Sequence, residues 1–487
     1  MTAAHPPRRA GAGAMPTLLA TLDAWCAAAE RRPGRWLILF AALLALQVGP
    51  MWYATPDGVA YLSIARSLAA ANEPANLGRP QLGFPIGYPL LISPLFQLGP
   101  RPLLLLSLAH WLLAMVCMLG VYRWARGQTV DAAPWVAALV MANVHTWILY
   151  RRTLSEAAFC ALLPWTVLAW NAVVAPRDLA SAGRRAARAL IAVALLALLT
   201  AIREAGALVG IGAAVAATIA GRRDAARLPL AFAAAAGILA LAILAAVVRP
   251  ERLQAATQEL GAVAAAARAG GPAMLLEHLR LRILDLGQLV VPGMFKAYDD
   301  RWLSIATLTF IPVAAALAVA WWRFARRRAD VFAWTVPPYV ALYLVWPYAA
   351  ARYLLPLLPV LWLSLWSAAA AWPHRRALFA VGLAAHLGVA AGYLIAIDAP
   401  RARACDAAWP AVDAVAAQPR DLVHPLAAGD GVPECVRLML ELALDEPVGR
   451  DGGGAQALLL AAGGAVPAHF AVETVAGDYV LARRGER

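Results

Sequence analysis

Asp57 is the first residue of this chain whose type and position could do chemistry. It lies in the stretch "TPDGVAYLSIARSLAA", residues 55–70, directly after the first long apolar run. A carboxylate there can take a proton from a substrate hydroxyl as a general base. It can equally accept backbone N–H groups at the start of the following helix, as an N-cap does. The two roles are compatible, so the neighbours of Asp57 in space must decide which one matters.

Basic side chains recur at the turns that should lie on the same side as Asp57. They are Arg151 and Arg152 with Glu156, Arg203 with Glu204, and Arg352. A guanidinium binds phosphate oxygens with two parallel N–H groups, although any single one could instead snorkel or pair locally, as Arg203 could with Glu204. Because several such turns converge on one face with Asp57, we expect a shared anionic ligand. Asp299, which precedes a later apolar run, either reaches the same site or caps that helix.

The elements that must position these residues are those of a membrane protein. Hydrophobic residues make up 62% of the 487 residues and charged residues only 15%, with a mean hydropathy of +0.65. Soluble domains carry about 25% charged residues, so this chain cannot bury its apolar surface in a water-surrounded core. The net charge of +13 comes in short arginine clusters between apolar runs, which favours membrane topology over nucleic-acid binding.

A membrane span needs about 20 mostly apolar residues. Eleven runs qualify, at residues 36–54, 101–122, 132–150, 155–175, 187–201, 204–220, 228–248, 302–322, 331–348, 353–371 and 377–397. The fifth and sixth could form one kinked helix. Eleven separate spans, however, place every dense arginine cluster on the cytoplasmic side, as the positive-inside rule requires. We therefore expect the N-terminus inside and the C-terminus outside.

The predicted fold class is an all-α polytopic membrane protein with a small α/β domain at the C-terminal end. Residues 1–35 form a cytoplasmic arm, residues 36–397 the membrane domain, and residues 398–487 a periplasmic domain. The first outer loop, residues 55–100, should carry interfacial helices, and a long outer loop covers residues 249–301. Cys405 and Cys435 both lie in the C-terminal domain. A disulfide is expected there in an oxidising compartment, and two unpaired buried cysteines are the alternative.

Four motifs in order resemble the type-C glycosyltransferases of the aminoarabinose-transferase and protein-mannosyltransferase superfamily. The first outer loop matches with Asp57, Tyr61, the "AR" that ends at Arg66, and the proline-rich segment around Tyr88. The others are "TLSEAAFCALL" (153–163), "LTAIREAGALVG" (199–210) and "ARYLLPLLPVL" (351–361). The similarity covers roughly residues 36–397. Many relatives carry Asp-Glu in the first loop, whereas here Gly58 follows Asp57.

The resemblance implies an enzyme of the bacterial cytoplasmic membrane that moves a sugar from a polyprenyl-phosphate carrier to an acceptor on the periplasmic face, with inversion. Asp57 would be the base. The donor phosphate would be held by Arg203, Arg352 and Arg66, and the site lined by Tyr61, Tyr88, Glu156, Arg152 and Asp299. The partners would be that lipid-linked donor, membrane lipids, and a lipid, glycan or protein acceptor, with no nucleic acid. A divalent metal stays open, because the motif places only one carboxylate.

Two other functions are weighed against the transferase. A transporter or flippase should show polar residues inside the spans and repeats between the halves. Here the spans are nearly uncharged, no such repeat is visible, and the polar residues gather at one face. A non-catalytic scaffold that presents the C-terminal domain would leave the first-loop motif unexplained.

Overall fold

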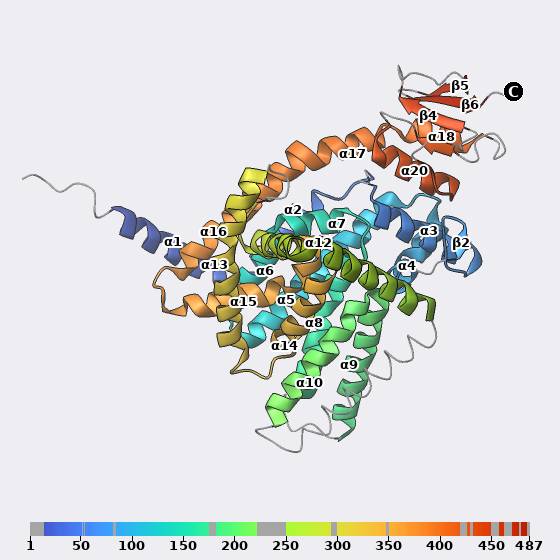
Figure 1. Ribbon diagram of the computed structural model, residues 1–487. Helices are drawn as coiled ribbons and strands as arrows, with labels where there is room; N and C mark the ends of the chain where they lie inside the picture. Colours follow the sequence, from blue (N-terminus) through green and yellow to red (C-terminus); the bar gives the residue numbers. More distant parts are fainter. Residues whose placement is uncertain are drawn as a thin grey trace, which may run out of the picture.

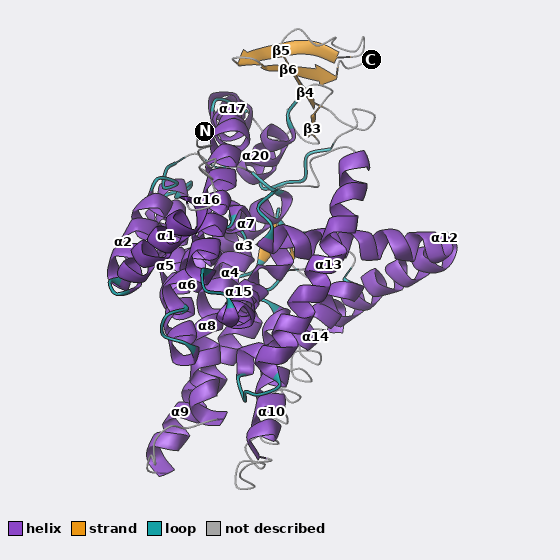
Figure 2. Cartoon of the chain, turned by 90° about the vertical axis from the view of Figure 1, so that its left-hand side faces the viewer, coloured by secondary structure: helices purple, strands orange, loops and turns teal. Residues whose placement is uncertain are grey.

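A computed structural model shows a bundle of long helices with a small α/β domain at one end (Figure 1). The strands β3 to β6 gather at that end, and the rest of the described chain is almost entirely helical (Figure 2). The structure describes residues 14–50, 52, 54–80, 84–174, 182–221, 250–293, 300–346, 350–418, 426–428, 432–449, 457–461, 470–476 and 479–484.

Seven helical segments among these residues are long and apolar enough to cross a membrane. They contain α5 (Leu103–Gln128), α8 (Ser155–Val174), α9 (Ala182–Ile202), α10 (Ala207–Gly221), α13 (Asp300–Ala325), α15 (Leu358–Ala368) with the preceding η5 (Ala351–Leu357), and α16 (Arg375–Tyr393). Two shorter apolar helices are α2 (Pro33–Ala45) and α14 (Val331–Val345). The chain is therefore a multi-pass membrane protein. The predicted span at 228–248 lies outside the described residues.

The predicted span over residues 132–150 is bent and not one straight helix. The structure breaks it into α6 (Ala133–Ala142) and α7 (Val144–Arg151), bent by 63°. Asn143 causes the break, because its backbone is extended and its Oδ1 accepts the His145 N–H over 2.9 Å to cap α7. Its Nδ2 donates to the Leu289 carbonyl, also over 2.9 Å, which fixes the bend. This redirects the chain toward the turn that carries Glu156.

The fifth and sixth predicted spans are separate helices, α9 and α10, which lie side by side (Figures 1 and 2). They are joined at Arg203 by one short turn, η2 (Glu204–Gly206). The N-terminal helix α1 (Ala14–Glu30) packs against α16, where Arg376 Nε donates to Glu30 over 2.8 Å. The predicted N-terminal arm thus contains a helix that packs against the bundle.

The two segments that carry Glu156 and Arg352 lie at the centre of the bundle. The span over Ala351–Ala371 is 67% buried and α8 is 61% buried, against 22–50% for the other spans. Phe159, Leu163 and Val167 of α8 are buried in this core, as are Leu358 and Leu363 of α15. Because most of each helix is buried, the two helices are a rigid support for the side chains at their ends.

The first outer loop folds into short elements along that end of the bundle. These are α3 (Pro56–Ala71), the two-stranded ladder of β1 (Ala75–Asn76) and β2 (Arg79–Pro80), α4 (Gly87–Ile92) and η1 (Ser93–Leu98). Gly87 allows α4 to pack against the end of α9, because a Cβ at this position would lie 2.6 Å from the Ala201 carbonyl. The proline-rich segment is thereby held beside the turn that carries Arg203.

The long outer segment contains α12 (Pro250–Val290), which is broken at Gly271, where φ is 60°. A left-handed backbone followed directly by Pro272 cannot continue a helix. The second half of α12 packs against α13 and η5 and buries Arg282 and Asp285. The Tyr343 hydroxyl donates to Asp285, which ties this half of α12 to the outer end of α14.

The C-terminal domain grows directly out of the membrane bundle. The helix α16 continues through one π-helical turn (Leu394–Asp398) into α17 (Ala399–Asp406), so the predicted boundary at residue 398 falls inside a continuous helix. It is held there by the buried Asp398 carboxylate, which pairs with Arg151 Nε over 2.7 Å. The next helices are α18 (Trp409–Ala416) and α20 (Glu434–Leu444).

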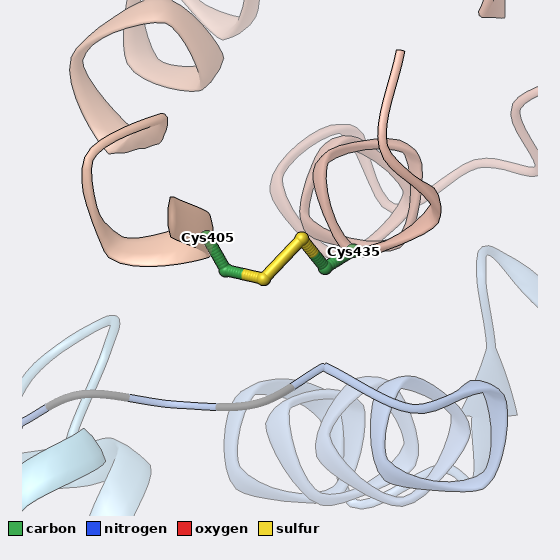
Figure 3. Close-up of a disulfide and its surroundings, with 2 residues drawn as sticks. All are labelled: Cys405 and Cys435. Atoms are coloured by element: carbon green, nitrogen blue, oxygen red, sulfur yellow. A yellow bond between two sulfur atoms is a disulfide. The ribbon is translucent and has the colours of Figure 1, made fainter. Parts of the chain in front are cut away.

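A four-stranded sheet with the order β3-β4-β6-β5 completes this domain. It consists of β3 (Leu426–Ala428), β4 (Ala457–Ala461), β5 (Phe470–Ala476) and β6 (Tyr479–Arg484). β3 and β4 are parallel, and β6 pairs antiparallel with β4 and β5. The runs "DLVHPLAA", "AQALLLAA" and "GDYVLAR" predict β3, β4 and β6, whereas β5 was not predicted. Cys405 of α17 and Cys435 of α20 form a disulfide (Figure 3).

Candidate active site

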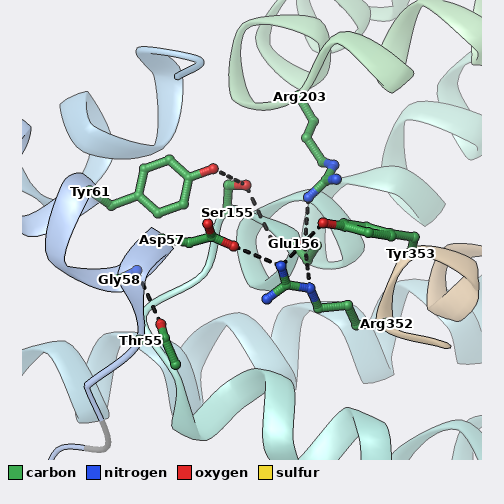
Figure 4. A network of polar contacts seen from close by, with 9 residues as sticks. All are labelled: Thr55, Asp57, Gly58, Tyr61, Ser155, Glu156, Arg203, Arg352 and Tyr353. Carbon is green, nitrogen blue, oxygen red and sulfur yellow. Dashed lines mark hydrogen bonds and ion pairs between the residues drawn. The ribbon is translucent and has the colours of Figure 1, made fainter. Parts of the chain in front are cut away.

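The first turn of α3 is capped by Thr55 and leaves the Asp57 carboxylate available. Thr55 Oγ1 accepts the Gly58 N–H over 3.1 Å, and Pro56 occupies the first helical position, where its missing N–H costs nothing. The prediction that Asp57 caps this helix was wrong. The Asp57 side chain is instead 38% exposed and accepts a hydrogen bond from Arg352 Nη2 over 2.7 Å (Figure 4).

Gly58 stands where many relatives of the predicted family keep a second acid, and packing excludes one here. A Cβ at residue 58 would lie 2.8 Å from Thr55 Oγ1 and 3.4 Å from the Thr153 carbonyl oxygen. Any side chain would displace the hydroxyl that caps α3. This departure from the motif therefore follows from how α3 begins.

Glu156 supplies the second carboxylate of the site from the first turn of α8. Its side chain is 4% exposed and lies 2.7 Å from Arg203 Nη1 and 3.5 Å from Arg352 Nε. Burial of the Arg203 guanidinium lowers its pKa, and the Glu156 carboxylate more than offsets this, so the pKa lies above its ordinary value. One buried acid thus anchors two cations that come from turns almost 150 residues apart.

Tyr353 fixes the two guanidinium groups from one side. Arg203 and Arg352 lie 5.0 and 5.1 Å from the centre of its ring, within the range of a cation–π contact. Its hydroxyl accepts a hydrogen bond from Arg352 Nη2 over 3.2 Å. Sequence reasoning missed Tyr353, although it lies inside the "ARYLLPLLPVL" motif directly after Arg352.

The predicted site residues Tyr61 and Tyr88 line the wall next to this network. The Tyr61 hydroxyl lies 2.9 Å from Ser155 Oγ, which in turn donates to Glu156 Oε2 over 3.4 Å. The Tyr88 hydroxyl lies 2.7 Å from His110 Nε2, and the two tyrosine rings meet edge to face. Burial raises the pKa of both phenols well above the ordinary value, so neither ionises near neutral pH. Of the two carboxylates in this network, Asp57 is the one that the geometry leaves partly exposed.

Two predicted basic residues lie elsewhere. Arg66 pairs with Asp445 of the C-terminal domain over 2.8 Å and donates to the Leu442 carbonyl over 2.7 Å, so we do not assign it to a phosphate. Arg152 Nη2 donates to the Tyr393 hydroxyl of α16 over 3.3 Å. Asp299 lies outside the described residues. Within the described ranges, no three His, Cys, Asp or Glu side chains gather in a way that could hold a metal ion.

An apolar cavity lies below the network on the bundle side. Its lining includes Cys160, one turn after Glu156 on α8, and Leu355 and Pro356, one turn after Arg352. Apolar walls keep the local dielectric low, which strengthens the charge–charge interactions at their rim. The site is therefore a polar rim on an apolar support, with two acids and two arginines whose charges balance.

No family model and no curated protein sequence matches the chain. Solved structures do. ArnT from Cupriavidus metallidurans bound to undecaprenyl phosphate superposes with a TM-score of 0.58 at 13% identity, covering 92% of this chain and 97% of that one. The apo state of the same ArnT gives a TM-score of 0.55 at 13% identity, covering 92% and 98%. The chain therefore has the fold that its motifs predicted, that of the type-C glycosyltransferases represented by ArnT.

Proposed function

We propose that this chain is a membrane glycosyltransferase that takes a sugar from a polyprenyl-phosphate carrier and transfers it to an acceptor on the periplasmic face of the bacterial cytoplasmic membrane. The observation that carries the proposal is the network of Asp57, Glu156, Arg203 and Arg352. Its members come from four segments far apart in the sequence and meet at one end of the bundle. The undecaprenyl phosphate named in the ArnT structure supports a lipid phosphate as the ligand.

The reaction is a single displacement at the anomeric carbon. The acceptor oxygen forms a bond to that carbon, and the bond between the carbon and the donor phosphate oxygen breaks. The bonding electron pair leaves with the phosphate, and the proton of the acceptor hydroxyl passes to the Asp57 carboxylate. The products are the glycosylated acceptor and the free polyprenyl phosphate, and Asp57 later loses its proton to water.

Arg203 and Arg352 have the chemistry to stabilise the leaving phosphate. Its charge grows as the glycosidic bond breaks, so cations already in place lower the barrier. The contacts to Glu156 and Tyr353 hold both guanidinium groups before any ligand arrives. Arginine can also grip two phosphate oxygens at once, which fixes the direction in which the leaving group departs.

Inversion at the anomeric carbon is the stereochemical outcome that we propose. Retention through a covalent intermediate needs a second carboxylate that can attack the sugar. The second acid here, Glu156, is 4% exposed and is held by two arginines, so its lone pairs are already engaged. One exposed carboxylate supports a one-step reaction.

The decisive test replaces Asp57 with Asn in the full-length protein in nanodiscs. Transfer is assayed with a panel of undecaprenyl-phosphate-linked monosaccharides and bacterial envelope acceptors, and native mass spectrometry of the wild type looks for a co-purified polyprenyl phosphate. Asp57→Asn should lose transfer and keep its fold. Asp413→Asn is the matched control and should stay active, because Asp413 is an exposed acid of α18 that pairs with Arg101. Full activity of Asp57→Asn would sink the assignment.

A further inference from the structure

The base and one of the phosphate-binding groups are bonded to each other in this structure. Asp57 Oδ2 and Arg352 Nη2 lie 2.7 Å apart. In this state one oxygen of Asp57 is bonded to Arg352, and Asp57 occupies the place at Nη2 that a phosphate oxygen would take. Building on the proposed function, we infer that the donor phosphate displaces Asp57 from Arg352, so that binding of the donor releases the base.

The unequal burial of the network decides which contact breaks. The Glu156 side chain is 4% exposed, whereas Arg352 is 27% and Asp57 38% exposed. An ion pair open to water contributes only about 0–1 kcal/mol, while removing one partner of a buried pair costs roughly 3–5 kcal/mol. The contact between Asp57 and Arg352 is therefore the one that an incoming ligand can reach and open. Glu156, 2.7 Å from Arg203 and 3.5 Å from Arg352, stays in place.

Two features let Asp57 leave without harm to the rest of the site. Thr55 caps α3, so rotation of the Asp57 side chain breaks no hydrogen bond at the helix N-terminus. Arg352 keeps its contacts to Glu156 through Nε and to the Tyr353 hydroxyl through Nη2. The exchange therefore needs only a rotation of the Asp57 side chain, while the Arg352 guanidinium stays where it is.

The charges of the cycle balance with this exchange. Before transfer, the donor phosphodiester carries one negative charge and the released Asp57 another. During transfer the phosphate gains one negative charge while Asp57 takes the acceptor proton and becomes neutral, so the net charge of the site stays constant. When Asp57 loses that proton to water, its carboxylate competes again for Arg352 and helps to expel the polyprenyl phosphate.

The test measures the binding of undecaprenyl phosphate itself to full-length protein in nanodiscs. If Asp57 competes with the phosphate, Asp57→Asn should bind undecaprenyl phosphate about two- to fivefold more tightly than the wild type, as expected for loss of a part-exposed ion pair. In an Arg352→Ala background the same substitution should give no such gain. Asp413→Asn is the control and should bind like the wild type.

Each other outcome has a definite meaning. Unchanged or weaker binding by Asp57→Asn overturns the exchange. A gain that persists in the Arg352→Ala background also overturns it, because it would then come from the general loss of a negative charge. If Asp57→Asn loses transfer while its affinity stays at the wild-type value, the exchange fails and the proposed function stands. If the wild type binds no undecaprenyl phosphate and transfers no sugar, both fail.

Discussion

Ser63 on α3 donates a hydrogen bond to Asp445 Oδ1 over 2.8 Å, although the two residues are 382 positions apart. Arg66, one turn further along α3, pairs with the same carboxylate oxygen over 2.8 Å. Ser63 also accepts the Leu77 N–H over 2.8 Å, so the ladder after α3 joins the same cluster. The C-terminal domain is thus fastened to the helix that carries Asp57.

Replacing Asp445 with Asn should cost little stability, whereas Asp445→Ala should cost more. Asp445 adopts a left-handed backbone (φ 59°) at the C-terminal end of α20. Asn tolerates this conformation nearly as well as Asp, so the Asn variant loses mainly a part-exposed ion pair, worth up to about 1 kcal/mol. Ala adds about 1–2 kcal/mol of backbone strain. Thermal unfolding in detergent measures both, and equal losses would contradict this account of Asp445.

Gly58→Ala should lower activity more than stability. The new Cβ would lie 2.8 Å from Thr55 Oγ1 and force the capping hydroxyl aside, at a cost of roughly 1–3 kcal/mol. Because Asp57 is the preceding residue, its carboxylate would shift from Arg352. Transfer rate and melting temperature are compared with those of Gly49→Ala, whose Cβ would meet nothing within 4 Å. Wild-type activity in Gly58→Ala would show that transfer does not depend on the close packing of residue 58 against Thr55.

Variants of the buried pair Arg203 and Glu156 can separate the contribution of Arg203 to stability from its contribution to transfer. Arg203→Ala leaves a carboxylate with 4% exposure short of its closest cation and should destabilise the protein by about 3–5 kcal/mol. The double variant Arg203→Met/Glu156→Leu removes both charges and should recover most of that stability. Both variants should be inactive, because neither holds the phosphate. Recovered transfer in the double variant would mean that Arg203 serves only to neutralise Glu156.

The disulfide should stabilise the C-terminal domain measurably. Cys405 and Cys435 are 30 residues apart and link α17 to α20, and bonds of this kind contribute about 2–4 kcal/mol. Wild-type protein should therefore melt at a lower temperature in the presence of dithiothreitol. The variant Cys405→Ser/Cys435→Ser should have the lower melting temperature without dithiothreitol, and adding dithiothreitol should not change it. An equal response of the two proteins would assign the effect to something other than this bond.

The sequence was informative about the face of the membrane domain on which a residue lies, because that follows from topology. Asp57, Glu156, Arg203 and Arg352 could be predicted to share one face, because the positive-inside rule places their turns there. The pairing within that face could not be predicted, since it depends on side chains from four turns packing together. Arg66 shows the limit most clearly, because its partner Asp445 lies in a domain that the motifs do not cover.

Local backbone features could not be predicted from the hydropathy pattern either. The predicted third span is apolar enough on average to hide its polar residues Asn143, His145 and Thr146. Average hydropathy does not place the bend; the cap that Asn143 makes and its contact to Leu289 do. Thr55 rather than Asp57 caps α3, since Pro56 begins the helix one residue before Asp57. β5 was not predicted, although the Gly477-Asp478 pair between "FAVETVA" and β6 is a hairpin turn signal.

The contact between Ser63 and Asp445 also sets the order in which this protein can mature. A ribosome makes α3 long before it makes α20, so Asp57 enters the membrane environment with its supporting domain still unsynthesised. The disulfide between Cys405 and Cys435 can form only after α20 has been synthesised, because Cys435 belongs to that helix. The contact that supports α3 therefore forms late in assembly, and a chain halted before synthesis of its C-terminal domain carries the site residues without this support.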